Sequence, residues 1–152
     1  MFNIQNILLP TDFSNLSLSA ARYAIDIAKQ YGAKIHFLNV LEKTPPILAI
    51  RSLDLSEDKI IKTIEEDARS SLNKALDTIN RDKAVEIIPV IQKGIDFEII
   101  IDYAESNKID LIVIATHGRT GILHTLLGSV AEKVIRYAKC PVLVITPSEN
   151  EK

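Results

Sequence analysis

Short apolar segments alternate with longer segments of helical periodicity along the whole chain, and this alternation constrains the fold most strongly. Two of the apolar segments, residues 111–114 and 142–145, contain no polar position at all. A strand of a parallel sheet has such a composition when helices cover both of its faces. We therefore expect an α/β protein with an open five-stranded parallel sheet and helices on both faces.

The boundaries follow from β-branched content, from hydrophobic spacing and from bounding Gly, Pro and polar residues. Strands are predicted at residues 4–9, 33–41, 85–91, 110–115 and 141–145, and helices at 14–31, 56–80, 96–107 and 129–139. Gly32 is expected to end the first helix, and Ser129 with Glu132 is expected to form a capping box. The inward-facing residues are expected to include Ile61, Ile64, Ala68, Leu72, Ala75 and Ile79 in the second helix and Val130, Val134 and Tyr137 in the last.

Composition excludes several classes of protein. The 152 residues include 18 basic and 20 acidic side chains, which gives no electrostatic footprint for binding nucleic acid. No apolar run approaches the roughly 20 residues that span a bilayer, and the single cysteine rules out an internal disulfide. We expect a cytoplasmic protein with no membrane contact, one domain over residues 1–146, and a polar tail at 147–152.

Ligands of open parallel sheets bind beyond the carboxyl ends of the strands, and the segment after the fourth predicted strand is the richest of these. Residues 116–129 contain three glycines, hydroxyl groups at Thr116, Thr120 and Ser129, and the base Arg119. Glycines let backbone N–H groups approach an anion, and the helix that follows adds unpaired amides and its positive dipole end. The composition is typical of a phosphate cradle. In the alternative interpretation, the glycines make turns and Gly128 with Ser129 only caps a helix.

The chain resembles the universal stress protein family from residue 7 to residue 145. The resemblance rests on Leu-Leu-Pro-Thr-Asp-Phe-Ser at 8–14, on residues 115–134 and on Cys-Pro-Val-Leu-Val-Ile at 140–145. Nucleotide-binding members share Gly-x-x-Gly, nine residues, then Gly-Ser or Gly-Thr. Gly118 and the pair Gly128–Ser129 match this pattern, whereas Ala115 replaces the first glycine. The resemblance implies a Rossmann-like fold, similar to the adenine nucleotide alpha hydrolases, with strand order 3-2-1-4-5.

By the same resemblance, the ligand is ATP with Mg²⁺. Asp12 would contact a ribose hydroxyl or the phosphate-bound Mg²⁺, although it is alternatively a cap for the first helix. Val40 would wall the adenine pocket, where main-chain groups recognise the base. The implied nucleotide-binding residues are Pro10, Thr11, Asp12, Val40, Ala115, Thr116, His117, Gly118, Arg119, Thr120, Gly121, Gly128, Ser129 and Val130.

Other chemistry finds little support in the sequence. His36, His117 and His124 lack the spacing of metal ligands, and Cys140 has no neighbouring base, which favours a packed thiol. The segment after the first strand lacks the glycines of an adenylating enzyme. A phospho-receiver domain would need paired carboxylates there and another acid where residues 92–94 stand.

We therefore expect an ATP-binding regulatory protein rather than an enzyme, because residues 116–129 contain no carboxylate or glutamine to orient water. The alternative is a homodimer of the same family that binds no nucleotide, which Ala115 favours. Dimerisation is expected through the exposed edge of the last strand, Val142, Leu143, Val144 and Ile145. The apolar connection at 41–55 could cover the adenine pocket, dock an unidentified partner protein, or pack under the neighbouring helix.

Overall fold

The computed structural model describes residues 1–42, 56–117 and 127–146. The expectations for residues 43–55 and for the tail at 147–152 lie outside the described residues. The elements are β1 (Asn6–Pro10), α1 (Asn15–Tyr31), β2 (Lys34–Leu41), α3 (Glu57–Ile79), β3 (Ile87–Lys93), α4 (Asp96–Ser106), β4 (Leu111–Ala115), α5 (Ser129–Tyr137) and β5 (Val142–Ile145). The strands form one parallel sheet in the order β3-β2-β1-β4-β5, as expected.

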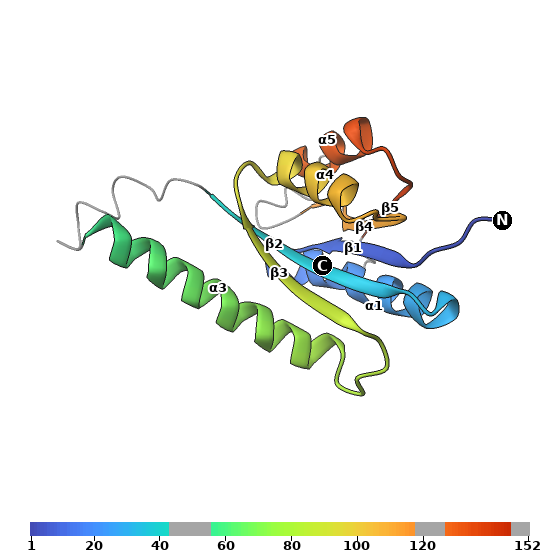
Figure 1. The fold of residues 1–152 in the computed structure, drawn as a ribbon, viewed down its shortest axis with the longest axis horizontal. Helices are drawn as coiled ribbons and strands as arrows, with labels where there is room; N and C mark the ends of the chain where they lie inside the picture. Colours follow the sequence, from blue (N-terminus) through green and yellow to red (C-terminus); the bar gives the residue numbers. More distant parts are fainter. Residues whose placement is uncertain (43–55, 118–126, 147–152) are drawn as a thin grey trace.

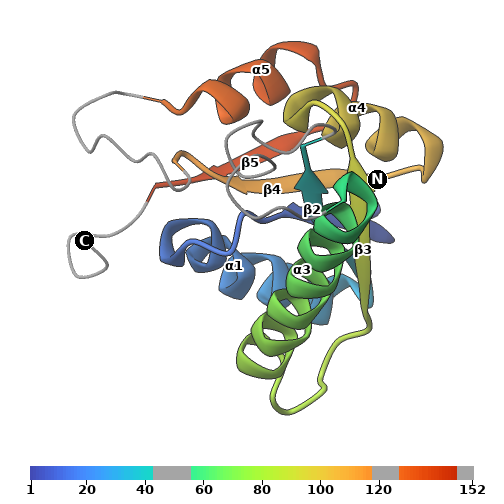
Figure 2. The same cartoon turned by 90° about the vertical axis from the view of Figure 1, so that its left-hand side faces the viewer.

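The molecule has three layers, with α1 and α3 on one face of the sheet and α4 and α5 on the other (Figures 1 and 2). Alternate strand residues point to opposite faces, which divides the core in two. Ile7 and Leu9 of β1 pack on the side of α1. Leu8, between them, packs on the side of α4 and α5. All five residues of β4 are buried, as its uniformly apolar sequence predicts. No described helix is long and apolar enough to cross a membrane.

The first helix begins and ends where its sequence predicts. Ser14 is its N-cap, and the Ser14 hydroxyl accepts a hydrogen bond from the Ser17 N–H at 3.1 Å. The helix stops at Gly32, which has a left-handed φ of 67° and donates its N–H to the Ala28 carbonyl. Glycine adopts this conformation without the steric cost of a β-carbon.

The predicted capping box of the last helix is wrong. Gly128, not Ser129, is the N-cap of α5, and no side chain caps this helix end among the described residues. The Gly128 N–H donates to the Thr116 carbonyl at 2.6 Å, which draws the start of the helix against the end of β4. Ser129 thereby becomes the first helical residue, where its side chain is exposed.

Two strands differ from their predictions because of their positions at the sheet edges. β3 runs two residues further than expected because its pairing with β2 continues to Lys93, opposite Leu41. β5 is not covered on both faces: only Ile145 is buried, and the other three residues are half-buried. Edge strands are less covered than central ones, so apolar composition alone overestimated the burial of β5.

Two helices pack on a slightly different face from the predicted one. In α3, Ile60 is buried while Ile64 is 37% exposed and Ile61 only half-buried. In α5, Ala131 and Val134 face the core, whereas Tyr137 is 54% exposed.

Candidate functional site

The order of the strands places the predicted site residues around the carboxyl end of β1. Neighbouring strands β2 and β4 flank β1, and the chain crosses to opposite faces of the sheet on its two sides. Such a switch point is where open α/β sheets bind ligands. The site residues brought to this end are Pro10, Thr11 and Asp12 after β1, Val40 on β2, Ala115, Thr116 and His117 at β4, and Gly128, Ser129 and Val130 at α5. Gly118, Arg119, Thr120 and Gly121 lie outside the described residues.

The turn between β1 and α1 is held by side chains rather than by glycines. The buried Thr11 hydroxyl accepts the Phe13 N–H at 3.0 Å and lies 3.0 Å from the Ser17 hydroxyl. Asp12 Oδ1 accepts both the N–H and the hydroxyl of Ser14, at 2.9 and 2.6 Å. Asp12 therefore forms the cap-like turn that the sequence allowed, and this turn fixes the orientation of its carboxylate.

Phe13 occupies an unfavourable backbone conformation within this turn. Its φ is 66°, in the left-handed region that residues with a β-carbon rarely adopt. The Phe13 side chain packs against the core on the side of α1, which holds the turn in place. Backbone strain of this kind costs about 1–3 kcal/mol and is concentrated at functional sites.

Asn39 also belongs to this end of the sheet, although the sequence analysis did not identify it. It is 5% exposed on β2, and its Nδ2 donates to the Thr11 carbonyl at 2.9 Å. The Oδ1 of Asn39 is buried and has no hydrogen-bond partner among the described residues. A polar amide between apolar neighbours, in Leu-Asn-Val at residues 38–40, is the signal that could have revealed it.

The start of α5 lies directly against the end of β4. A β-carbon on Gly128 would stand 2.6 Å from the Thr116 carbonyl oxygen, so only glycine fits here without a backbone shift. The Gly128 N–H is used by Thr116, and the amides available to an anion therefore begin at Ser129. The N–H groups of the first helical turn have no acceptor within the helix, and the helix dipole adds positive potential there.

Ala115, which replaces the first glycine of the family motif, lies in regular strand geometry. It is the last residue of β4, pairs with Ile145 and is absent from the described residues with positive φ. Its side chain is buried in the core on the side of α1. The backbone at residue 115 therefore has no need of glycine's conformational freedom.

The carboxyl end also carries negative charge. The pKa of Asp96, at the start of α4, is raised by partial burial and then by the nearby charges of Glu42 and Asp12. The described residues contain no group of three or more His, Cys, Asp or Glu side chains that could hold a metal ion by themselves. A divalent cation at this end would consequently need ligand oxygens in addition to Asp12.

Two further polar side chains, His36 and Cys140, lie away from the candidate site. His36 on β2 contacts the Tyr103 hydroxyl at 2.8 Å through Nδ1 and Asn6 Oδ1 at 3.4 Å through Nε2. Burial and the charge of Lys34 lower its pKa, so it stays neutral within the core. Burial raises the pKa of the Cys140 thiol, which disfavours the reactive thiolate.

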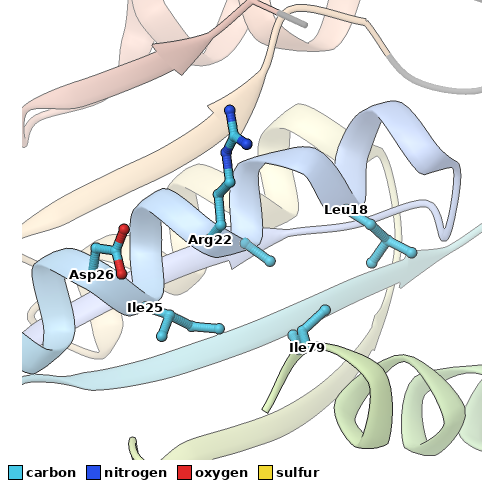
Figure 3. A pocket seen from close by; sticks show the side chains of 6 residues that line it. Leu18, Arg22, Ile25, Asp26 and Ile79 are labelled. Atoms are coloured by element: carbon cyan, nitrogen blue, oxygen red, sulfur yellow. The ribbon is translucent and has the colours of Figure 1, made fainter. Parts of the chain in front are cut away.

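A cavity of about 230 Å³ lies between α1 and the end of α3, and none of the predicted site residues lines it. Figure 3 shows Leu18 and Ile25 of α1 on the side of Ile79, with Arg22 extending away. The walls supply few polar groups that could orient a ligand. The carboxyl end of the sheet therefore remains the stronger candidate site.

Comparison with known proteins shows to which family the chain belongs. Residues 3–146 match the sequence model of the Universal stress protein family. A universal stress protein of Methanocaldococcus jannaschii is 36% identical over 97% of this chain and 85% of its own length. A second protein of that organism, solved as a hypothetical protein, is 27% identical with a TM-score of 0.80 over 96% of this chain and 98% of its own. A universal stress protein solved in complex with cAMP is 27% identical, with a TM-score of 0.68. The match covers 96% of this chain and 99% of that protein. The chain belongs to the universal stress protein family.

Proposed function

We propose that this chain binds an adenine nucleotide, ATP with Mg²⁺, at the carboxyl end of its sheet. The observation that carries the proposal is the start of α5, where Gly128 brings the first-turn amides against the end of β4. Amides at a helix N-terminus bind phosphate groups through their N–H donors and the helix dipole. The cAMP complex of a related universal stress protein supports an adenine nucleotide as the ligand class.

Each part of the nucleotide has residues of suitable chemistry at this end. The amides of Ser129 and Val130 and the exposed Ser129 hydroxyl would hold phosphate oxygens. Asp12 would accept from a ribose hydroxyl or share Mg²⁺ with the phosphates, in a turn that already fixes its orientation. Main-chain groups near Val40 would recognise the base, with its half-buried side chain as a wall.

Binding rather than fast catalysis is the proposed output. Efficient hydrolysis needs a residue that orients water and a metal cage at the γ-phosphate. Asp12 is already engaged by Ser14, and Ser129 and Val130 offer only neutral donors. Nucleotide occupancy would act as the signal by favouring the conformation that binds the nucleotide better.

Titration calorimetry of the purified protein with ATP and Mg²⁺ tests the proposal. We expect saturable binding with one site per chain. Ser129→Pro should weaken it by about tenfold, because proline is tolerated at the first helical position yet removes one N–H donor. Glu57→Pro makes the same change at the start of α3 and should leave the affinity unaltered. Absence of saturable binding to the unmodified protein would refute the proposed function.

We also propose that the chain forms a homodimer through β5. This dimer is expected both if the chain binds a nucleotide and under the alternative function, a structural homodimer that binds none. β5 is an edge strand whose residues Val142, Leu143 and Val144 are half-buried in the single chain. An unpaired apolar edge favours pairing, and antiparallel pairing with a second copy gives a two-fold symmetric dimer. Sedimentation should show a dimer that Val144→Lys converts to monomers, and a variant that remains dimeric would exclude this interface.

A further inference from the structure

From the contacts of Asn39 we infer that it is a positioning residue of the nucleotide site, acting through Thr11 to hold Asp12 in its binding orientation. The inference rests on the proposed function. Asn39 lies on β2 at the carboxyl end, next to the pair Leu38 and Pro10 that joins β2 to β1. It is buried, and its Nδ2 reaches across to the Thr11 carbonyl at 2.9 Å.

This hydrogen bond acts on the peptide group immediately before Asp12. The Thr11 N–H is already fixed by the Leu38 carbonyl at 2.8 Å, so β2 holds Thr11 by both its N–H and its carbonyl group. The next peptide begins the turn in which Phe13 takes its positive φ. Without the Asn39 contact, the Thr11 carbonyl is released and rotation of the Thr11–Asp12 peptide can relax Phe13.

The unpartnered oxygen of Asn39 argues against a purely stabilising role. A buried polar atom without a partner costs about 1–3 kcal/mol, which offsets what the bond to Thr11 contributes. An asparagine in the middle of a buried strand is therefore close to neutral for stability. Its value lies in the geometry that it imposes on Thr11 and Asp12, since a preorganised site loses less entropy when the ligand binds.

The chain provides a matched control in Asn80. Its Nδ2 also donates to a backbone carbonyl, that of Val85, at 2.9 Å, and its Oδ1 is also a buried atom without a partner among the described residues. Asn80 follows α3 at the amino end of the sheet, away from Asp12. The two asparagines thus share one hydrogen-bonding pattern and differ in what they hold.

Calorimetry with ATP and Mg²⁺ on four proteins tests the inference: unmodified, Asn39→Ala, Asn80→Ala and Asn39→Thr. We expect Asn39→Ala to weaken ATP binding about five- to tenfold, the equivalent of one lost hydrogen bond. Asn80→Ala should bind within twofold of the unmodified protein. Asn39→Thr serves where alanine prevents folding, because threonine suits a strand and its hydroxyl is too short to reach Thr11. Unchanged affinity in Asn39→Ala or Asn39→Thr would overturn the inference.

A double-mutant cycle separates positioning from general destabilisation. If Asn39 acts through Asp12, then Asn39→Ala should add less than a further twofold loss in an Asp12→Ala background. Fully additive losses would show that Asn39 does not act through Asp12. Failure of the unmodified protein to bind ATP would instead refute the proposed function, so the two failures are distinguishable.

Discussion

The two ends of the sheet are built from the same residue types and differ in what those residues hold in place. Each end has a glycine beside a helix terminus, an asparagine whose Nδ2 donates to a backbone carbonyl, and a carboxylate that accepts from the backbone. At the amino end, Asp110 Oδ2 accepts the N–H groups of Gln5 and Asn6, at 2.8 and 2.9 Å. At the carboxyl end, Asp12 instead holds a turn in which the next residue is strained.

If the proposed function holds, the difference teaches that similar contacts serve stability at the amino end and ligand binding at the carboxyl end. Gly32, at the amino end, has open space where a β-carbon would lie and is needed only for its positive φ. Gly128 has ordinary φ and is needed because the Thr116 carbonyl leaves no room. Gly32 ends a helix, whereas Gly128 brings the first-turn amides of α5 against the end of β4, where we propose that the nucleotide binds.

Substituting the two glycines should have the largest effect. Gly128→Ala must push α5 away from β4, and we expect ATP binding to weaken at least about tenfold. Gly32→Ala should destabilise the fold by about 1 kcal/mol through left-handed strain and leave the ATP affinity unchanged. Calorimetry on both variants measures the ATP affinity, and thermal unfolding measures the loss of stability. An equal loss of ATP affinity in Gly128→Ala and Gly32→Ala would contradict the assignment of ligand binding to the carboxyl end alone.

Removing the carboxylate of the amino end should affect stability alone. Asp110→Ala leaves two backbone N–H groups without their acceptor, and we expect a loss of about 2 kcal/mol. For a chain of this size the melting temperature should fall by roughly 4–8 °C. ATP affinity, measured by calorimetry below the melting transition, should stay within twofold. A variant that unfolds normally yet binds ATP poorly would contradict the assignment of the two ends.

The smallest effect concerns the pH dependence of stability at the amino end. Burial and Lys34 lower the pKa of His36 in the folded state, so the unfolded chain takes up the proton first as the pH falls. Acidification below about 6.5 therefore favours unfolding. In His36→Gln this part of the stability loss should disappear, as denaturant unfolding at pH 7 and pH 5 would show. If the free energy of unfolding of His36→Gln falls between pH 7 and pH 5 as much as that of the unmodified protein, His36 is not the source of this loss.

The fold was predictable from the sequence because its determinants are local and repetitive. Uniformly apolar residues 111–114 indicate a central strand, and Ser14 and Gly32 bound α1 by local hydrogen bonds and conformation. The predictions were wrong where contacts between residues distant in sequence determine the boundary of a helix or strand. The start of α5 depends on Thr116, and the two-residue shift of β3, from the predicted 85–91 to Ile87–Lys93, depends on pairing with β2 up to Leu41. Neither the contact of Gly128 with Thr116 nor the pairing of β3 with Leu41 can be predicted from motif spacing alone.

The sequence could nominate candidate site residues only at or near the carboxyl ends of the predicted strands and in the family motif. Asp12 and Ser129 stand beside recognisable motifs, whereas Asn39 is joined to Thr11 across 28 positions. Strain at Phe13 is likewise invisible in the sequence, since phenylalanine has no preference for positive φ. The substitution of Ala115 could be recognised from the motif, but only the strand geometry shows that this backbone position has no need of glycine.

Hydrogen–deuterium exchange with and without saturating ATP and Mg²⁺ tests the central claim most directly. The account predicts slower exchange at the first-turn amides of α5, from Ser129 onward, and in the β1–α1 turn. The amino end, including the amides of Gln5 and Asn6 held by Asp110, should exchange at the same rate in both states. Protection confined to the amino end, or no protection anywhere at saturating nucleotide, would contradict the account.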